Sequence, residues 1–277
     1  MKMPPTAMTS SARMRFWCLA LVVLTTAFAD LSADPPSDSP VATETAELSK
    51  KYRISLVTSQ PVFPIKIGPG DIDGKAATPK HLESYLPVLV SEWNLYPAEL
   101  IKRTGLRRII LCESLSFAGQ LRAAIPDFEH NDLYLDVWRG RHADRYVRLV
   151  IHHEFFHMID YRDDGSLYAD DKWGALNPPG FKYGTGGRNA QNDATVSLLN
   201  KDLPGFLNRY ATTGVEEDKA EVFAHLIVNR QVFEERARLD PILADKSRRM
   251  QEILQAFCTQ VDERFWDSAR KRQRPPP

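Results

Sequence analysis

The sequence predicts an α+β domain in which a small twisted sheet supports one long, buried helix. Segments with a strand-like pattern lie among longer helical ones, at residues 52–57, 107–115 and 132–138. The segment at residues 145–161 is apolar on nearly all sides, as a central helix is. Two further helical segments, 215–238 and 240–264, are expected to close the domain.

The first 29 residues are predicted to be a secretory signal peptide rather than part of the fold. Lys2, Arg13 and Arg15 precede an uncharged apolar run, and Ala27 and Ala29 supply an A-x-A cleavage pattern. The run is too short for a comfortable transmembrane helix. We therefore expect a secreted or periplasmic protein with no stable membrane anchor after cleavage.

Composition divides the rest of the chain. Residues 30–50 are rich in Pro, Ser, Thr and charge and lack aromatics, which predicts a flexible linker. The folded domain is then expected at residues 51–266, and residues 267–277 form a basic, Pro-rich tail. The formal net charge of the 277 residues is zero, which gives no electrostatic case for a nucleic-acid partner.

The first helical region is interrupted by prolines. Thr78 and Pro79 are typical of a cap followed by proline at the first helical position. Of the two later prolines, Pro87 and Pro97, one is expected to kink the helix and the other to start a second helix that stops at Gly105.

Two of the predicted strands differ in character. Residues 107–115 read as a buried strand, whereas polar and apolar residues alternate in residues 132–138, which indicates a strand nearer an edge. Such an edge could pair with an extended substrate peptide. Two cysteines remain after signal cleavage, Cys112 and Cys258, and the sequence leaves open whether they form a disulfide or stay as buried thiols.

The central helix carries the pattern H-E-x-x-H as His153, Glu154 and His157, and it holds three of the seven histidines. Two imidazoles one helical turn apart lie on one face and can bind one zinc ion. Glu154 flanks that ion without ligating it and can take a proton from a zinc-bound water. His152 points away from the metal face and is expected in the core or in support of a ligand.

A zinc enzyme of this kind needs a third protein ligand. Glu217, Glu221 and His225 are spaced by four, so they share one face of a later helix. Glu217 as ligand, with Glu221 holding the free ring nitrogen of a zinc-bound histidine, accounts for both carboxylates. Glu221 as ligand is the reverse assignment. Asp163 is a third candidate, although its geometry needs a glycine where Asp160 stands.

These two segments, "HEFFHMID" and "EEDKAEVFA", resemble the gluzincin metallopeptidases related to anthrax lethal factor and the Pro-Pro endopeptidases. The pattern of those families is H-E-x-x-H-x-x-D followed by E-x-x-A-E-x-F. The resemblance implies a zincin-like fold, one Zn²⁺ ion held by His153, His157 and Glu217, and Glu154 as the general base. It also implies that Glu221 supports a ligand without binding the metal.

The resemblance extends to two further positions and departs at others. A tyrosine seven residues before the ligand glutamate steadies the oxyanion in these families, and Tyr210 stands at that offset. Asp160 matches their trailing aspartate and is expected to support the site. The interval between His157 and Glu217 is long, and Asp218 and Lys219 replace the usual aromatics.

The sequence thus predicts an exported zinc metalloendopeptidase acting on a peptide or protein substrate. A Gly- and Pro-rich loop at residues 173–193 is expected to be ordered by its aromatics, with residues 177–187 at the cleft rim. An alternative from another class is an exported zinc-binding protein with a structural or inactive site, in which His225 or Asp163 is a fourth ligand. A hydrolase of a non-peptide bond shares the same chemistry.

Overall fold

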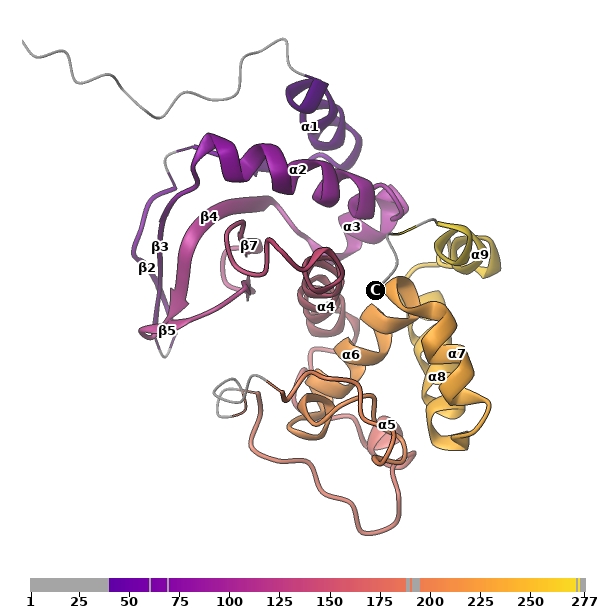
Figure 1. The fold of residues 1–277 in the computed structure, drawn as a ribbon. Coiled ribbons are helices and arrows are strands. Elements are labelled where there is room, and N and C mark those ends of the chain that lie inside the picture. The colour runs from indigo at the N-terminus through magenta and orange to yellow at the C-terminus, as the bar shows by residue number, and fades with distance from the viewer. Residues whose placement is uncertain are drawn as a thin grey trace, which may run out of the picture. The chain divides into compact units, whose positions relative to one another are not determined.

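The computed structural model describes residues 40–59, 61–68, 70–187, 190, 195–272 and 274 (Figure 1). All of them fall in one of the two units into which the chain divides, Ser32–Pro277. The predicted signal peptide and the first part of the predicted linker lie outside the described residues. Within the described part of the chain, no helix is long and apolar enough to cross a membrane.

A seven-stranded mixed sheet forms one layer, in the order β2-β3-β4-β7-β6, with β1 and β5 also paired to β4. The strands are β1 Ser55–Val57, β2 Ile65–Ile67, β3 Gly70–Ala76, β4 Arg108–Phe117, β5 Gln120–Leu121, β6 Ala124–Asp127 and β7 Asp132–Asp136. Strands β1 and β7 run parallel to β4, and the other pairs are antiparallel. The α+β class predicted from the sequence is confirmed.

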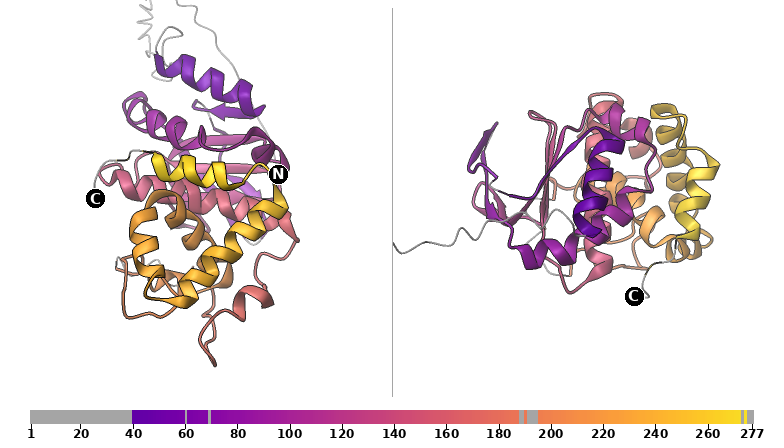
Figure 2. Two further views of the ribbon diagram at one scale, coloured as in Figure 1. Left: turned by 90° about the vertical axis from the view of Figure 1, so that its right-hand side faces the viewer. Right: turned by 90° about the horizontal axis from the view of Figure 1, so that it is seen from above.

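The helices gather on one side of this sheet, as the right-hand view in Figure 2 shows. They are α1 Pro40–Tyr52, α2 Pro79–Trp93, α3 Ala98–Thr104, α4 Asp144–Asp163, α5 Asp171–Gly174, the short 3-10 helix η2 Tyr210–Thr212, α6 Val215–Val228, α7 Arg230–Ala237, α8 Pro241–Phe257 and α9 Glu263–Lys271. The central helix predicted at residues 145–161 is therefore α4. Its observed bounds, Asp144–Asp163, extend slightly beyond the predicted ones at both ends.

The structure confirms that a second helix follows Pro97 and stops at Gly105, and Thr78 stands at the N-cap of α2 without a side-chain cap hydrogen bond. Helix α2 begins at Pro79 after Thr78 and continues through Pro87. Helix α3 begins directly after Pro97 and ends at Gly105, which has a φ of 72°. That left-handed conformation favours glycine, so Gly105 ends the helix without strain.

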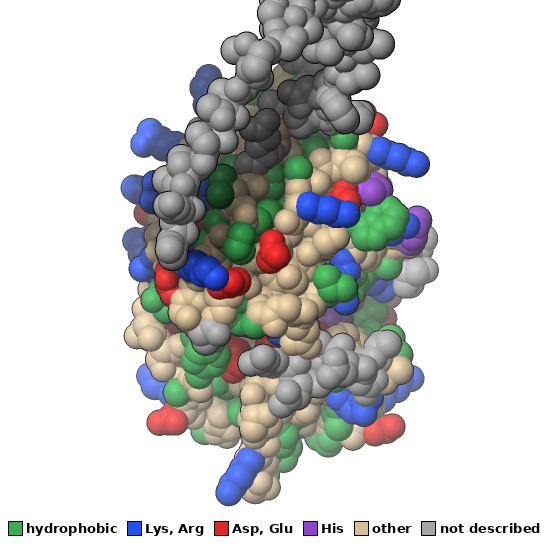
Figure 3. Space-filling model, turned by 90° about the vertical axis from the view of Figure 1, so that its left-hand side faces the viewer, with side chains coloured by type: hydrophobic (Ala, Val, Ile, Leu, Met, Phe, Trp, Pro, Cys, Tyr) green, Lys and Arg blue, Asp and Glu red, His purple; other side chains and the backbone are tan. Residues whose placement is uncertain are grey.

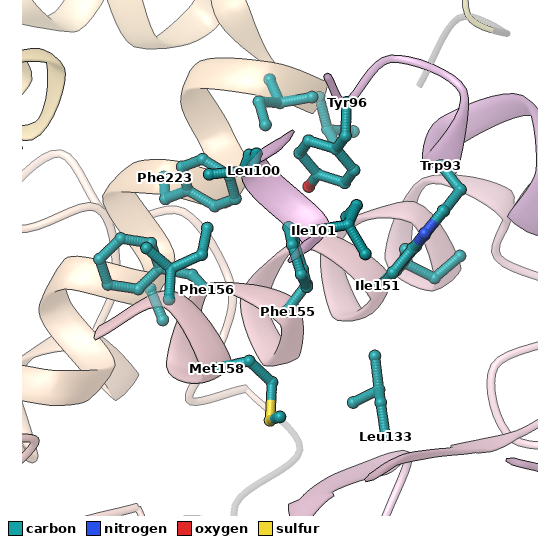
Figure 4. Packing of buried hydrophobic residues seen from close by; sticks show 14 of the residues in the cluster. Trp93, Tyr96, Leu100, Ile101, Leu133, Ile151, Phe155, Phe156, Met158 and Phe223 are labelled. Carbon is teal, nitrogen blue, oxygen red and sulfur yellow. The ribbon is translucent and has the colours of Figure 1, made fainter. Parts of the chain in front are cut away.

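The core lies between α4 and the sheet and continues around α4 to α6 (Figure 4). Alternate residues of β4 face opposite sides. Ile109 and Leu111 join the main cluster with the helices, whereas Ile110 and Cys112 join a smaller cluster on the other face of the sheet. Cys258 lies in the main cluster. The two cysteines are buried free thiols, so the thiol alternative holds.

Strand β7 corrects the edge-strand prediction. It lies between β4 and β6, and all five of its residues are buried. Its polar residues face partners rather than solvent, since Asp132 pairs with the guanidinium of Arg108 and Asp136 accepts a hydrogen bond from Leu115 N at 3.0 Å. The edge is β6, which contains Pro126.

Helix α1 corrects the linker prediction for residues 40–50. Leu48 and Tyr52 are buried in the main cluster. The hydroxyl of Tyr52 lies 2.8 Å from Trp93 O and 2.9 Å from Tyr96 O, beyond the C-terminal end of α2. Polar composition predicted a flexible segment, but residues 40–52 form a helix that packs against α2 and α3 through Leu48 and Tyr52, among other contacts.

Each of the two long helices predicted near the C-terminus is broken in two. Helices α6 and α7 meet at Asn229, whose φ of −117° and ψ of 38° leave the helical region and whose side chain bonds His225 Nδ1 at 3.0 Å. Helix α8 ends at Phe257, and Asp262 caps α9 by accepting from the backbone N–H of Arg264 and Phe265.

The basic tail also differs from its prediction. Helix α9 continues through Lys271, and the guanidinium of Arg274 bonds the carboxylate of Glu92 at 2.6 Å and Ile227 O at 2.8 Å. Glu92 is fully buried and also bonds His152 at 2.9 Å and Arg148. His152, next to the first histidine of the motif, is thus a core residue that fixes α4 against α2.

Figure 3 shows the face of the molecule that lies on the left-hand side of Figure 1. This face has no large patch of only positive or only negative side chains. Acidic side chains lie near the centre of that face and basic ones lie mainly toward its margins. This mixture agrees with the zero net charge of the chain.

Candidate metal centre

Helices α4 and α6 pack against each other and bring three side chains together. His153 Nε2 lies 3.0 Å from Glu217 Oε2, and His157 Nε2 lies 3.2 Å from His153 Nε2 and 3.6 Å from Glu217 Oε2. Ligands placed tetrahedrally at about 2.0–2.1 Å from a zinc ion stand about 3.3–3.4 Å apart. The three atoms therefore form a triangle of the size that one zinc ion requires, and we call this set the ligand triangle.

The triangle comes from the helical register of both helices. His153 and His157 are one turn apart, so both imidazoles project from the face of α4 that meets α6. Glu217 lies in the first turn of α6. Burial raises the pKa of its carboxyl, but hydrogen bonds from His153 and His157 outweigh burial and hold the pKa well below its usual range. These surroundings favour the carboxylate form of Glu217, which is the form that binds a metal ion.

Glu221 lies on the opposite side of the His153 ring from the triangle. Its Oε1 is 3.0 Å from His153 Nδ1, and its Oε2 accepts from Asn208 Nδ2 at 2.6 Å. A carboxylate at Nδ1 accepts a hydrogen bond from the ring N–H there, which keeps the proton on Nδ1 and leaves the Nε2 lone pair for a metal. The geometry places Glu217 rather than Glu221 at the triangle. Asn208 has no motif in the sequence, so only the fold reveals its part in holding Glu221.

Tyr210 stands beside the triangle on η2. Its hydroxyl donates to Glu217 Oε1 at 2.9 Å, and its ring centroid lies 5.8 Å from that of His153. One oxygen of Glu217 therefore faces the histidines while the other is held by the tyrosine. The structure thus brings Tyr210 to the site.

Glu154 follows His153 and is partly buried. Burial raises the pKa of its carboxyl, whereas the nearby imidazoles of His153 and His157 lower it, and the net pKa is raised. A raised carboxyl pKa suits a group that takes up a proton and returns it near neutral pH.

Asp160 makes no hydrogen bond to a ligand histidine among the described residues, since its Oδ2 and His157 Nδ1 both lack a hydrogen-bond partner. Its Oδ1 pairs with Lys219 Nζ at 2.5 Å, and Lys219 also reaches Asp170 at 3.3 Å. Burial raises the pKa of Asp160 to about 6, although Lys219 lowers it. Asp163 is exposed at the end of α4 and lies outside the ligand triangle.

Asp218 holds the long segment that separates His157 from Glu217. Its Oδ2 accepts from Trp173 Nε1 at 2.8 Å, Tyr183 Oη at 2.6 Å and Lys246 Nζ at 2.6 Å. Lys219 reaches the same segment through Asp170, as described above. The two residues that depart from the family pattern therefore anchor the loop that fills the long interval. The aromatics order its described part, as the sequence predicts.

The comparisons with known proteins bear on the fold. No family model matches the sequence, and no curated protein matches it. A solved structure from Bacteroides caccae, described as a "putative zinc-binding metallo-peptidase", is similar in fold with a TM-score of 0.53. The two chains are 17% identical, and the similarity covers 86% of this chain and 93% of the other.

Proposed function

We propose that this chain is a zinc-dependent metallopeptidase that hydrolyses peptide bonds outside the cytoplasm. The observation that carries the proposal is the ligand triangle of His153, His157 and Glu217, with Glu154 next to its first histidine. The fold similarity to a protein described as a zinc-binding metallo-peptidase supports it. Export rests on the predicted signal peptide at residues 1–29.

A bound zinc ion would lower the pKa of its water from about 16 to about 7 and polarise the substrate carbonyl group. The side chains of this chain would do the rest. Glu154 takes the proton of the attacking water and delivers it to the leaving amine. Tyr210, whose hydroxyl donates to Glu217 Oε1 in this structure, would turn that hydrogen bond to the negative charge that develops on the carbonyl oxygen. Glu221 orients His153 through its Nδ1.

Three protein ligands fit a catalytic ion better than a structural one. Structural zinc sites are closed by four protein ligands, whereas catalytic sites keep one position open. His225 has both ring nitrogens engaged elsewhere, with Nδ1 at Asn229 and Nε2 3.4 Å from Glu221. Asp163 is exposed and outside the triangle. Among the described residues, neither proposed fourth ligand reaches the site.

The test compares Glu154→Gln with the wild-type protein. We expect the variant to keep one zinc per chain and to lose hydrolysis of a denatured-protein substrate, because the amide cannot take up the proton. A chelator should abolish wild-type cleavage, and added zinc should restore it. Unchanged turnover in Glu154→Gln would refute the mechanism, and a wild-type protein that binds zinc without cleaving any peptide would favour a binding protein.

A further inference from the structure

A short glycine-rich segment crosses the ligand triangle on the side of Tyr210. We call residues 184–187, with the sequence GTGG, the glycine strap. Its backbone bonds the end of η2 and the residue that follows it, with Gly184 N donating to Thr212 O at 3.0 Å and Gly186 N donating to Thr213 O at 2.7 Å. The strap therefore has a fixed place relative to Tyr210 and the start of α6.

The last residue of the strap lies directly against the functional atoms. A Cβ added at Gly187 would lie 2.4 Å from Tyr210 Oη and 2.5 Å from Glu217 Oε1, which are the two atoms joined by the 2.9 Å hydrogen bond. Real Cβ atoms essentially never approach other atoms that closely. At every other described glycine the nearest atoms to an added Cβ belong to residues outside the ligand triangle, or nothing lies within 4 Å. Gly187 thus bounds the space that Glu217 and Tyr210 share.

Asp218, the residue that follows Glu217, anchors the glycine strap. Tyr183 immediately precedes the strap, and its hydroxyl bonds Asp218 at 2.6 Å. Asn177 Nδ2 reaches the same hydroxyl at 2.8 Å, and Phe181 packs on Phe206 at 4.5 Å between ring centroids. Because Asp218 is adjacent to Glu217 in α6, the strap and the ligand share one anchor.

We propose that Gly187 is a positioning residue, whose backbone holds the Glu217 carboxylate and the Tyr210 hydroxyl in the arrangement that binds the metal. This inference rests on the proposed zinc site. The φ of Gly187 lies outside the left-handed region, so the backbone accepts alanine. The atoms in the way are the ends of the Tyr210 and Glu217 side chains, which move more easily than backbone. Alanine should therefore disturb the site and leave the fold intact.

The experiment measures zinc affinity of Gly187→Ala in the full-length protein by competition with a chromophoric chelator. The matched control is Gly174→Ala in the same interval, where an added Cβ meets nothing within 4 Å. Without metal, we expect Gly187→Ala to unfold at a temperature close to that of metal-free wild type. We expect it to bind zinc about 10- to 100-fold more weakly than wild type, which is the range typical when a group that orients a ligand is lost. Gly174→Ala should bind zinc like wild type.

A double variant tests whether the effect passes through Tyr210. In a Tyr210→Phe background the hydroxyl that the Cβ would strike is absent and the contacts with Glu217 Oε1 and the ring remain, so the loss of zinc affinity caused by Gly187→Ala should be smaller than in wild type. An equal loss in both backgrounds, or a Gly187→Ala protein that binds zinc within twofold of wild type, would overturn the proposal.

Two further outcomes remain decisive. If Gly187→Ala does not fold, Tyr183→Phe replaces it, because it removes the bond to Asp218 and should also weaken zinc binding; an unchanged affinity there overturns the inference. A wild-type protein that binds no zinc would instead remove the proposed function together with the inference. If only the inference about Gly187 is wrong, the wild-type protein still binds zinc and cleaves its substrate.

Discussion

Substitution of Asp218 by alanine should destabilise the protein strongly, because this carboxylate is the centre of a fully buried cluster. Asp218 and Lys246 are both 0% exposed and lie 2.6 Å apart. Trp173 and Tyr183 donate to the same oxygen at 2.8 and 2.6 Å. Alanine would leave the ammonium group of Lys246 buried without its paired counter-charge, donating to Gly205 O at 2.7 Å and lying 3.8 Å from the ring centroid of Phe206.

The expected loss follows from the buried pair. Removing one partner of a buried ion pair costs about 3–5 kcal/mol, since the other charge stays uncompensated. That is a large part of the about 5–15 kcal/mol by which a domain is stable. Urea unfolding should show this loss for Asp218→Ala. Asp267→Ala is the control, because its pair with Arg270 is about half exposed and should contribute less than about 1 kcal/mol.

A double variant separates the effect of the lost charge from the effect of the lost packing. Asp218→Asn combined with Lys246→Met removes both charges while keeping similar volumes, and it should recover much of the stability that Asp218→Ala loses. If Asp218→Ala unfolds within about 1 kcal/mol of wild type, or no more easily than Asp267→Ala, the cluster does not anchor the interval as we argue.

Two further predictions concern Glu92 and Glu221. Burial raises the pKa of Glu92, but hydrogen bonds from His152 and Arg274 outweigh it and hold the pKa well below its usual 4.5. The carboxylate therefore stabilises the fold above pH 4.5, and this contribution is lost as the pH falls further. Glu92→Gln should be less stable than wild type at pH 7, by a gap that narrows below pH 4.5; a gap independent of pH would contradict this. Glu221→Ala should weaken zinc binding about 10- to 100-fold in a chelator competition, because His153 Nδ1 loses its acceptor, whereas the exposed Glu252→Ala should not; equal affinities would count against the role of Glu221.

The parts of the site that the sequence predicts are those set by helical spacing. His153 and His157 share a face because four residues make one turn, and the same rule puts Glu217 and Glu221 on one face of α6. Such local patterns do not say which carboxylate meets the histidines. That choice depends on how α4 and α6 pack, and the packing places Glu221 at Nδ1 and Glu217 at Nε2 of one ring.

Features that depend on distant contacts were not predictable from the sequence. The position of β7 inside the sheet follows from its pairing with both β4 and β6, and its aspartates are buried only because Arg108 and the backbone of β4 meet them. The docking of Arg274 on Glu92 joins residues 182 positions apart. Asp218 and Lys219 read as departures from a family pattern, yet the fold gives each of them a partner in the preceding loop.

Crystals grown with zinc and measured at the zinc absorption edge test the central claim most directly. We expect one anomalous peak per chain, about 2.0–2.2 Å from the Nε2 atoms of His153 and His157 and from Glu217 Oε2. No peak at that position, or a peak bound by Glu221 in place of Glu217, would contradict the account.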